Sequence, residues 1–119
     1  MALRKSNPAF LNGVPEMLVL KLLAERAMHG YDLVQAIKAV SREGLAFGEG
    51  CIYPILHRLE AERLLRSSKE EVSGRVRVVY RATARGKARL AETVSNWRQV
   101  VDSINCALEG GSHGQPAMA

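Results

Sequence analysis

The basic residues of this chain are concentrated in one segment. Residues 51–89 contain ten arginines and lysines against four acidic residues, whereas the rest of the chain contains seven basic and eight acidic residues. The ten are Arg58, Arg63, Arg66, Lys69, Arg75, Arg77, Arg81, Arg85, Lys87 and Arg89. A positive charge gathered in this way is typical of a surface that binds a polyanion, and nucleic acid is the first candidate.

Residue types that support catalysis or metal binding are present, but their spacing supports neither. His29, His57 and His113 show no metal-ligand spacing with one another or with the cysteines. No Gly-rich phosphate loop and no Ser/His/Asp or Cys/His arrangement is found, so we expect no enzyme, no metal and no cofactor. Cys51 and Cys106 lack a C-x-x-C spacing and are interpreted as reduced thiols. The alternative for Cys51 is a redox sensor whose pKa is lowered at a helix N-terminus.

Length and composition indicate one domain. The chain has 119 residues, of which 47% are hydrophobic, so it can bury a core. A domain of this size gains stability from oligomerisation. We see no signal peptide and no apolar run long enough to span a membrane, and we therefore expect a cytoplasmic protein with no membrane partner.

The hydrophobic periodicity predicts three helices in the first half of the chain. Their expected ranges are 15–28, 31 to between 42 and 44, and from 49–51 to 63. Pro54 must then lie in the first turn of the third helix, because a proline further inside removes a backbone hydrogen bond. Residues 45–47 place large apolar side chains at alternate positions and are a candidate for a very short strand.

The period changes from helical to alternating at residue 65, which predicts a two-stranded hairpin. The strands cover 65–71 and 75–82, with the turn at 72–74. Arg75, Arg77 and Arg81 share one strand face, while Tyr80 lies on the other. Thr83 then caps a last helix, 84–109, because its hydroxyl can accept an amide hydrogen bond from the first turn.

The apolar residues of the last helix are spaced alternately by four and three, as in a coiled coil. They are Leu90, Val94, Trp97, Val101, Ile104 and Leu108. We expect this face to pair two copies of the chain, with Trp97 in the interface.

The order of elements is that of a winged helix-turn-helix, which is mainly α with a small β-hairpin. We divide the chain into an N-terminal arm (1–14), a winged helix-turn-helix domain (15–83), a long C-terminal dimerisation helix (84–109) and a disordered tail (110–119). In this fold the third helix enters the major groove of DNA, and the hairpin reaches the adjacent backbone or minor groove.

Three segments resemble the PadR family of bacterial transcriptional regulators. They are Gly30–Leu33, Gly50–Glu60 and Gly74–Thr83, the last followed by Gly86, and the resemblance covers about 15–90. It implies a homodimer that binds a double-stranded DNA operator, usually as a repressor. It also implies that the C-terminal helix makes the dimer and that some members bind a small planar aromatic effector near the interface. Many members have serine or threonine at the position of Cys51, and a thiol is a weaker hydrogen-bond partner.

The expected DNA-contacting residues form two groups. Those on the third helix are Gly50, Cys51, Tyr53, Pro54, His57 and Arg58, and those of the hairpin that hold phosphates are Arg75, Arg77 and Arg81. Tyr31 is either structural or a phosphate donor. Trp97 is either a packing residue of the dimer or the wall of an effector pocket.

Each of these assignments has a less specific alternative. Tyr53 can pack against the hairpin, and His57 and Arg58 can simply be solvated. The hairpin arginines can be solvated too, although like charges on one face repel unless an anion is present. The alternative function is a winged helix that binds proteins and not an operator. The basic hairpin favours DNA over this alternative.

Overall fold

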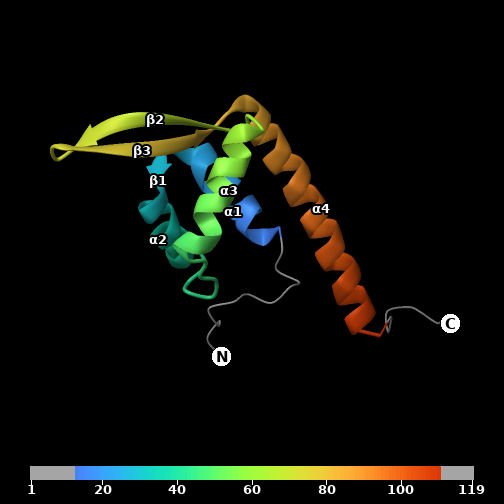
Figure 1. Ribbon diagram of the computed structural model, residues 1–119. Coiled ribbons are helices and arrows are strands. Elements are labelled where there is room, and N and C mark those ends of the chain that lie inside the picture. The colour runs from blue at the N-terminus through green and yellow to red at the C-terminus, as the bar shows by residue number, and fades with distance from the viewer. Residues whose placement is uncertain (1–12, 111–119) are drawn as a thin grey trace.

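The computed structural model describes residues 13–110, which form four helices and a small sheet (Figure 1). In chain order the elements are α1 (Val14–Glu25), β1 (Met28–His29), α2 (Gly30–Val40), α3 (Glu49–Ala61), β2 (Leu65–Val72), β3 (Arg75–Ala82) and α4 (Ala84–Leu108). The helices α1 to α3 pack together, while the β2–β3 hairpin and α4 project from this group in different directions (Figure 1). The predicted fold class is confirmed. The predicted N-terminal arm and C-terminal tail lie outside the described residues, apart from residues 13, 14 and 110.

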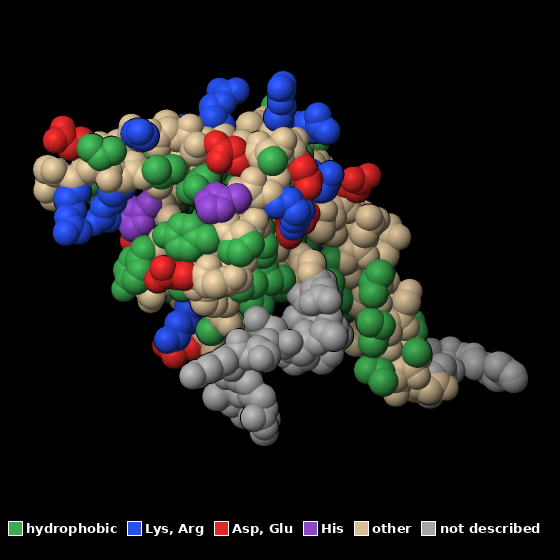
Figure 2. Space-filling model, viewed as in Figure 1, with side chains coloured by type: hydrophobic (Ala, Val, Ile, Leu, Met, Phe, Trp, Pro, Cys, Tyr) green, Lys and Arg blue, Asp and Glu red, His purple; other side chains and the backbone are tan. Residues whose placement is uncertain are grey.

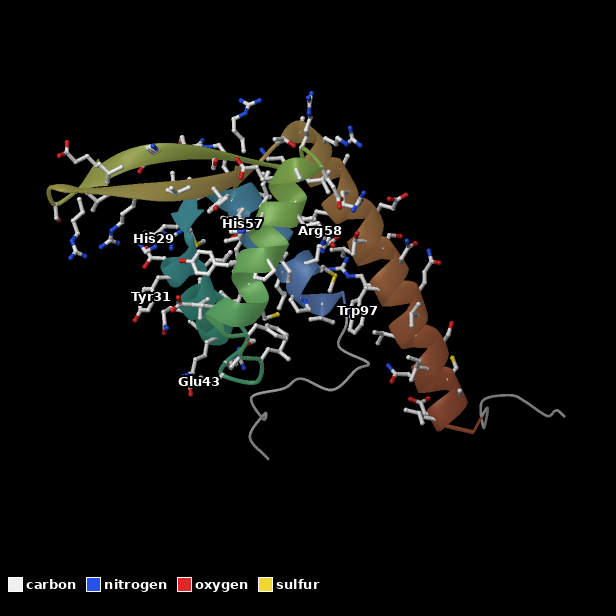
Figure 3. The ribbon with its side chains drawn as sticks, viewed as in Figure 1. His29, Tyr31, Glu43, His57, Arg58 and Trp97 are labelled. Atoms are coloured by element: carbon white, nitrogen blue, oxygen red, sulfur yellow. The ribbon has the colours of Figure 1, made fainter. Side chains whose placement is uncertain are left out.

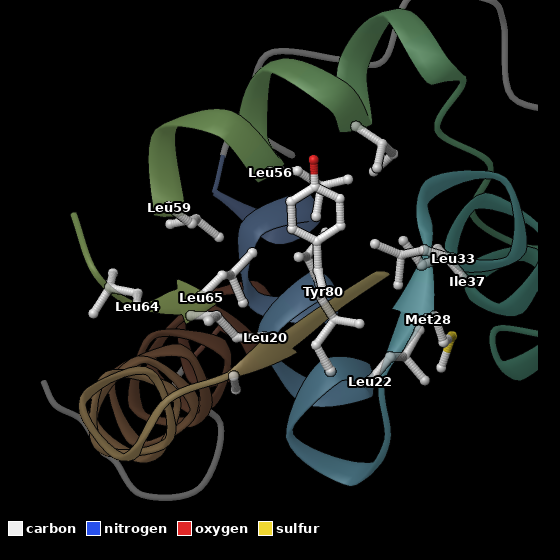
Figure 4. Packing of buried hydrophobic residues seen from close by; sticks show 14 of the residues in the cluster. Leu20, Leu22, Met28, Leu33, Ile37, Leu56, Leu59, Leu64, Leu65 and Tyr80 are labelled. Carbon is white, nitrogen blue, oxygen red and sulfur yellow. The ribbon is translucent and has the colours of Figure 1, made fainter. Parts of the chain in front are cut away.

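The core lies between the three packed helices and the sheet (Figure 4). The helix α1 is buried on several sides, as its nearly uniform apolar sequence predicts. Its side chains meet the inner face of α3, where Ile52, Leu56 and Leu59 are completely buried. Tyr80 of β3 reaches into the same cluster. The burial of one face of α3 therefore decides which of its residues point outward.

The sheet has three antiparallel strands in the order β1–β3–β2, so the prediction of a two-stranded hairpin was incomplete. Met28 pairs with Tyr80, and His29 pairs with Val79. A strand of two residues is too short to produce an alternating pattern in the sequence. Because these residues join the sheet, α1 ends at Glu25 and not near Met28 as predicted.

Two other local predictions were wrong. The segment 45–47 is not a strand; the amide of Leu45 donates to Ser41 Oγ, and Phe47 turns into the core with 1% exposure. Pro54 lies beyond the first turn of α3, which begins at Glu49. The ring of Pro54 leaves the carbonyl of Gly50 without its usual helical partner, and the exposure of Gly50 allows water to take that place.

The hairpin turn is confirmed where it was predicted. Ser73 and Gly74 both have positive φ, at 53° and 77°, and Val72 pairs with Arg75 across the turn. Two consecutive residues with positive φ match the right-handed twist of the flanking strands. This turn lets β2 and β3 pair along their whole length.

Thr83 fixes the point where α4 leaves the domain. Its hydroxyl accepts from the amide of Gly86 at 3.0 Å, as predicted, and donates to the carbonyl of Arg63 at 2.8 Å. Its amide also donates to the carbonyl of Leu64. The N-cap of α4 is therefore bonded to the turn that follows α3. Among residues 13–110, no helix combines the length and apolar composition needed to cross a bilayer.

The close approach of Gly86 to Leu64 yields a test. A Cβ at residue 86 would lie 2.1 Å from the carbonyl oxygen of Leu64, so Gly86→Ala must displace backbone. We expect a loss of about 1–3 kcal/mol of folding free energy, measured by urea unfolding. The control is Gly50→Ala, because nothing lies within 4 Å of that Cβ position. Equal stability of the two variants would contradict this description of the junction.

Candidate nucleic-acid interface

One stripe of α3 faces away from the core. Gly50, Pro54 and His57 are exposed and recur at helical spacing, and Tyr53 beside them is half-buried. These positions lie opposite the buried face of the helix, since the core fixes the rotation of α3 about its axis. The structure thus brings together four of the six residues predicted on this helix.

The stripe borders an open cleft of about 530 Å³ between α2, α3 and the hairpin. Its lining includes His29, Tyr31, Tyr53, His57, Arg75 and Arg77. Figure 3 shows His29 and Tyr31 near the start of α2, on the side of α3 where His57 also lies. With Tyr80, which also lines it, the cleft combines two guanidinium groups, two imidazoles and three phenols, all of which can donate hydrogen bonds to an anion.

Tyr53 is held in the cleft by a glycine of α2. A Cβ at Gly30 would lie 2.5 Å from the Tyr53 ring, so only glycine allows the ring to occupy this place. The centroids of the Tyr53 and His57 rings are 6.4 Å apart at a tilted angle. Tyr53 thus packs against Gly30 of α2 and lines the cleft, while its predicted contact with DNA stays a prediction.

His29 connects α2 to the hairpin. Its Nδ1 accepts from the amide of Asp32 at 3.4 Å, which caps α2. Its Nε2 lies 2.5 Å from Nη1 of Arg77 and 3.1 Å from the carboxylate of Asp32. A neutral imidazole has one donor and one acceptor nitrogen, so the tautomer of His29 decides which of these contacts is a hydrogen bond. The contact with His29 orients Arg77 along the wall of the cleft.

The hairpin is also fixed to α3 itself. The hydroxyl of Ser67 on β2 donates to the Glu60 carboxylate at 2.5 Å. Tyr80 is 6% exposed, and burial, followed by the charge of Glu60, raises the pKa of its phenol. Tyr80 therefore joins the sheet to the helical core.

The three predicted hairpin arginines do not share one environment. Arg75 and Arg77 line the cleft, whereas Arg81 is exposed and paired across the strands with Arg66. Figure 2 shows basic side chains both near the hairpin tip, beside the histidines, and along the opposite edge of the sheet. The two cleft arginines are consequently separate from a second basic patch formed by Arg66 and Arg81.

Two predicted residues of α3 lie on its flank, away from the exposed stripe. Arg58 forms ion pairs with Glu16 of α1 at 2.8 Å and with Glu62 at 3.4 Å. The hydrogen bond to Glu16 is the main cause that raises the pKa of Arg58. Cys51 packs against the core, and burial raises the pKa of its thiol. A raised pKa disfavours the thiolate that a redox sensor requires.

Sequence reasoning missed several residues of this region. His29, Gly30 and Val78 line the cleft, and Glu16 holds Arg58. The segment Gly30–Leu33 resembles the family, and its glycine is the sequence signal for a close contact. Nothing in the sequence pairs Glu16 with Arg58. Within the described part of the chain, no three His, Cys, Asp or Glu residues are arranged to hold a metal ion.

A second surface lies on α4. Trp97, Val100, Ile104 and Leu108 are exposed by 41%, 51%, 50% and 78% and follow one face of the helix. Three of them, Trp97, Ile104 and Leu108, belong to the predicted coiled-coil face. Val101 was also predicted on this face but is half-buried, and its neighbour Val100 is exposed there instead. Trp97 lies toward α1 (Figure 3) and lines a pocket of about 220 Å³ with Val14 and Met17.

Solved structures share this fold. A transcriptional regulator from Clostridium thermocellum superposes with a TM-score of 0.77 at 24% identity, over 82% of this chain and 96% of that one. A PadR family regulator from Eggerthella lenta gives a TM-score of 0.72 at 32% identity, over 84% and 86% of the two chains. The arrangement of three helices, hairpin and long last helix is thus that of winged helix-turn-helix regulators.

Sequence comparison identifies the family. The profile of the PadR-like family of transcriptional regulators matches residues 19–92. The transcriptional regulator Rv3488 of Mycobacterium tuberculosis is 42% identical over 87% of this chain and 92% of its own length. This chain therefore belongs to the PadR-like family of transcriptional regulators, and the family prediction is confirmed. The family consists of regulators and not of enzymes, which agrees with the missing catalytic pattern.

Proposed function

We propose that this protein is a homodimeric regulator that binds double-stranded DNA at a specific operator. The cleft between α3 and the hairpin is the observation that carries the proposal. It places two arginines beside the exposed stripe of the helix, so that base edges and phosphates are contacted by adjacent surfaces. An α-helix fits the major groove, and this division of contacts is usual for the fold.

Base contacts come from the exposed stripe of α3. His57 can donate or accept at a base edge, and Pro54 offers an apolar surface to a thymine methyl group. Gly50 has no side chain and allows the backbone to approach the DNA closely. Tyr53 is fixed by Gly30, so its hydroxyl is presented without further ordering. Cys51 and Arg58 lie on the flank and contribute less to base contacts.

Phosphate contacts come from the hairpin and the start of α2. Arg75 and Arg77 form one wall of the cleft, and Tyr31, 54% exposed, stands near its mouth. The hydroxyl of Tyr31 can donate to the same phosphate group. Arg81 and Arg66 form a neighbouring patch for the DNA backbone where it leaves the cleft. These contacts make affinity depend on salt but carry no sequence information.

The cleft arginines provide the direct test. In Arg75→Ala/Arg77→Ala we expect weaker binding to every duplex and a slope of log affinity against log salt that is smaller by about two. Binding is measured by fluorescence anisotropy over a range of salt concentrations. Arg26→Ala/Arg98→Ala is the matched control, because it removes the same charge from exposed residues outside the cleft.

An unchanged salt slope in the cleft variant would overturn the assignment of these arginines. If the wild-type protein bound no selected duplex better than random DNA, the alternative of a protein-interaction module would replace operator binding.

The exposed face of α4 provides the dimer contact. In its first half, this face packs on α1, and it continues past α1 as Val100, Ile104 and Leu108. No other element between residues 13 and 110 covers this apolar extension. A second α4 with the same spacing fits it, since the interface between two identical chains is self-complementary.

A charge in the middle of this face tests the dimer. We expect Ile104→Asp to shift the protein from dimer to monomer in sedimentation equilibrium, because the contact would bury an unpaired carboxylate. Ser95→Asp is the control, since Ser95 is exposed on the opposite side of α4. A protein that is already monomeric without the substitution, or an Ile104→Asp variant that remains dimeric, would exclude this interface.

We further propose that the protein acts as a repressor in the bacterial cytoplasm and is released from DNA by a small aromatic effector. A dimer bound over a promoter represses by occupancy alone. The pocket beside Trp97 supports the effector, because it is bordered by Val14, Met17 and Val100 and lies on the face of α4 assigned to the dimer. A planar aromatic ring can stack there on the indole.

Trp97 is the sole tryptophan, so its fluorescence reports on this pocket alone. We expect planar aromatic compounds to quench or shift its emission and to weaken operator binding over the same concentration range. Saturated analogues of equal size are the control. Unchanged emission across a broad aromatic panel would count against an effector in this pocket.

A further inference from the structure

Four charged side chains connect three helices on the side of α3 that faces away from the cleft. Glu16 of α1 lies between Arg58 of α3 and Arg89 of α4, and its two carboxylate oxygens contact them at 2.8 Å and 3.5 Å. Glu62 at the end of α3 completes the group, at 3.4 Å from Arg58 and 4.0 Å from Arg89. We refer to these four residues as the ionic cluster.

Glu16 is the central member of the ionic cluster. Its side chain is 19% exposed, whereas those of Arg58, Glu62 and Arg89 are 49%, 41% and 37% exposed. Ion pairs this accessible to water contribute little to folding stability. Their geometry matters more than their energy, because the carboxylate of Glu16 contacts both α3, which makes the base contacts, and α4, which makes the dimer contact.

We infer that Glu16 is a positioning residue for DNA binding, which fixes the angle between α3 and α4 through Arg58 and Arg89. The inference rests on the proposed function, since this angle matters only if α4 pairs two protomers on one duplex. Arg58 then acts through Glu16 and not by touching a base. Both of its terminal nitrogens already face carboxylates, and Figure 3 shows it on the side of α3 toward α4.

The length of α4 makes this angle important. Its 25 residues span about 37 Å, so a rotation of about 10° at the junction moves the far end by about 6 Å. The two recognition helices of a dimer must lie about 34 Å apart to reach successive major grooves. Thr83 and Gly86 fix where α4 begins, and the ionic cluster restrains its direction one turn later. Loss of this restraint should relax the spacing of half-sites that the dimer accepts.

The test measures how the affinity of the protein for DNA depends on the spacing between the two half-sites. Duplexes are first selected from a random pool by the wild-type protein, and a second set receives two extra base pairs between the half-sites. The wild type should strongly prefer the original spacing. We expect Glu16→Gln to reduce this preference about tenfold while affinity for a single half-site and the unfolding temperature stay the same.

Four further variants sharpen the experiment. Glu25→Gln is the matched control, because within residues 13–110 the ion pair of Glu25 is with Lys21 of its own helix. Arg89→Lys keeps the charge and should retain the spacing preference, whereas Arg89→Gln should lose it. A Glu16→Gln protein with wild-type spacing preference would overturn the inference. The inference would also be overturned if Arg58→Gln weakened discrimination at a single base pair and left the spacing preference unchanged. That result would assign Arg58 to base contact.

Failure of the proposed function would look different. A wild-type protein that enriches no site, or that sediments as a monomer, would overturn operator binding by a dimer, and the role of Glu16 with it. If the wild type enriches a site and sediments as a dimer, the inference is decided by the comparison of Glu16→Gln with Glu25→Gln.

Discussion

The complete burial of one face of α3 is the constraint on which the rest of the structure depends. Ile52, Leu56 and Leu59 are inaccessible to solvent, and each would have to leave the core if the helix rotated. Burial of three such side chains contributes several kcal/mol, about 1.5–3 for each. The opposite stripe, with Pro54 and His57, is therefore presented in one orientation. The site does not need its own contacts to hold this helix in place.

Around this fixed helix, two attachments determine where the other surfaces lie. Tyr80 and Ser67 attach the hairpin to α3, so the cleft arginines stay beside the exposed stripe. Thr83 attaches α4 to the turn that follows α3, and this sets where the apolar face of α4 leaves the domain. The basic segment of the sequence thus divides into groups with different surroundings. Arg75 and Arg77 face the cleft, Arg58 and Arg89 belong to the ionic cluster, and Arg81 lies opposite Arg66.

The sequence predicted those features that depend on local pattern. Helical spacing identified α3 and α4, alternation identified β2 and β3, and Ser73–Gly74 identified the turn. Features that depend on contacts between distant residues were not predictable in this way. The strand β1 has two residues and exists only because β3 pairs with it. The pairing of Glu16 with Arg58 crosses 42 positions of sequence, and the placement of Tyr53 depends on Gly30 of another helix. Pro54 was misplaced because an exposed carbonyl at Gly50 tolerates the loss of a helical bond.

The central claim is that DNA binds across the cleft between α3 and the hairpin. The most direct measurement is an NMR titration of the backbone amides with a duplex selected by the protein. We predict that the largest changes map to Tyr53, His57, Arg75 and Arg77, while the flank of α3 at Arg58 changes less. Changes concentrated on α1 and the first half of α4, with the cleft residues unaffected, would contradict the account.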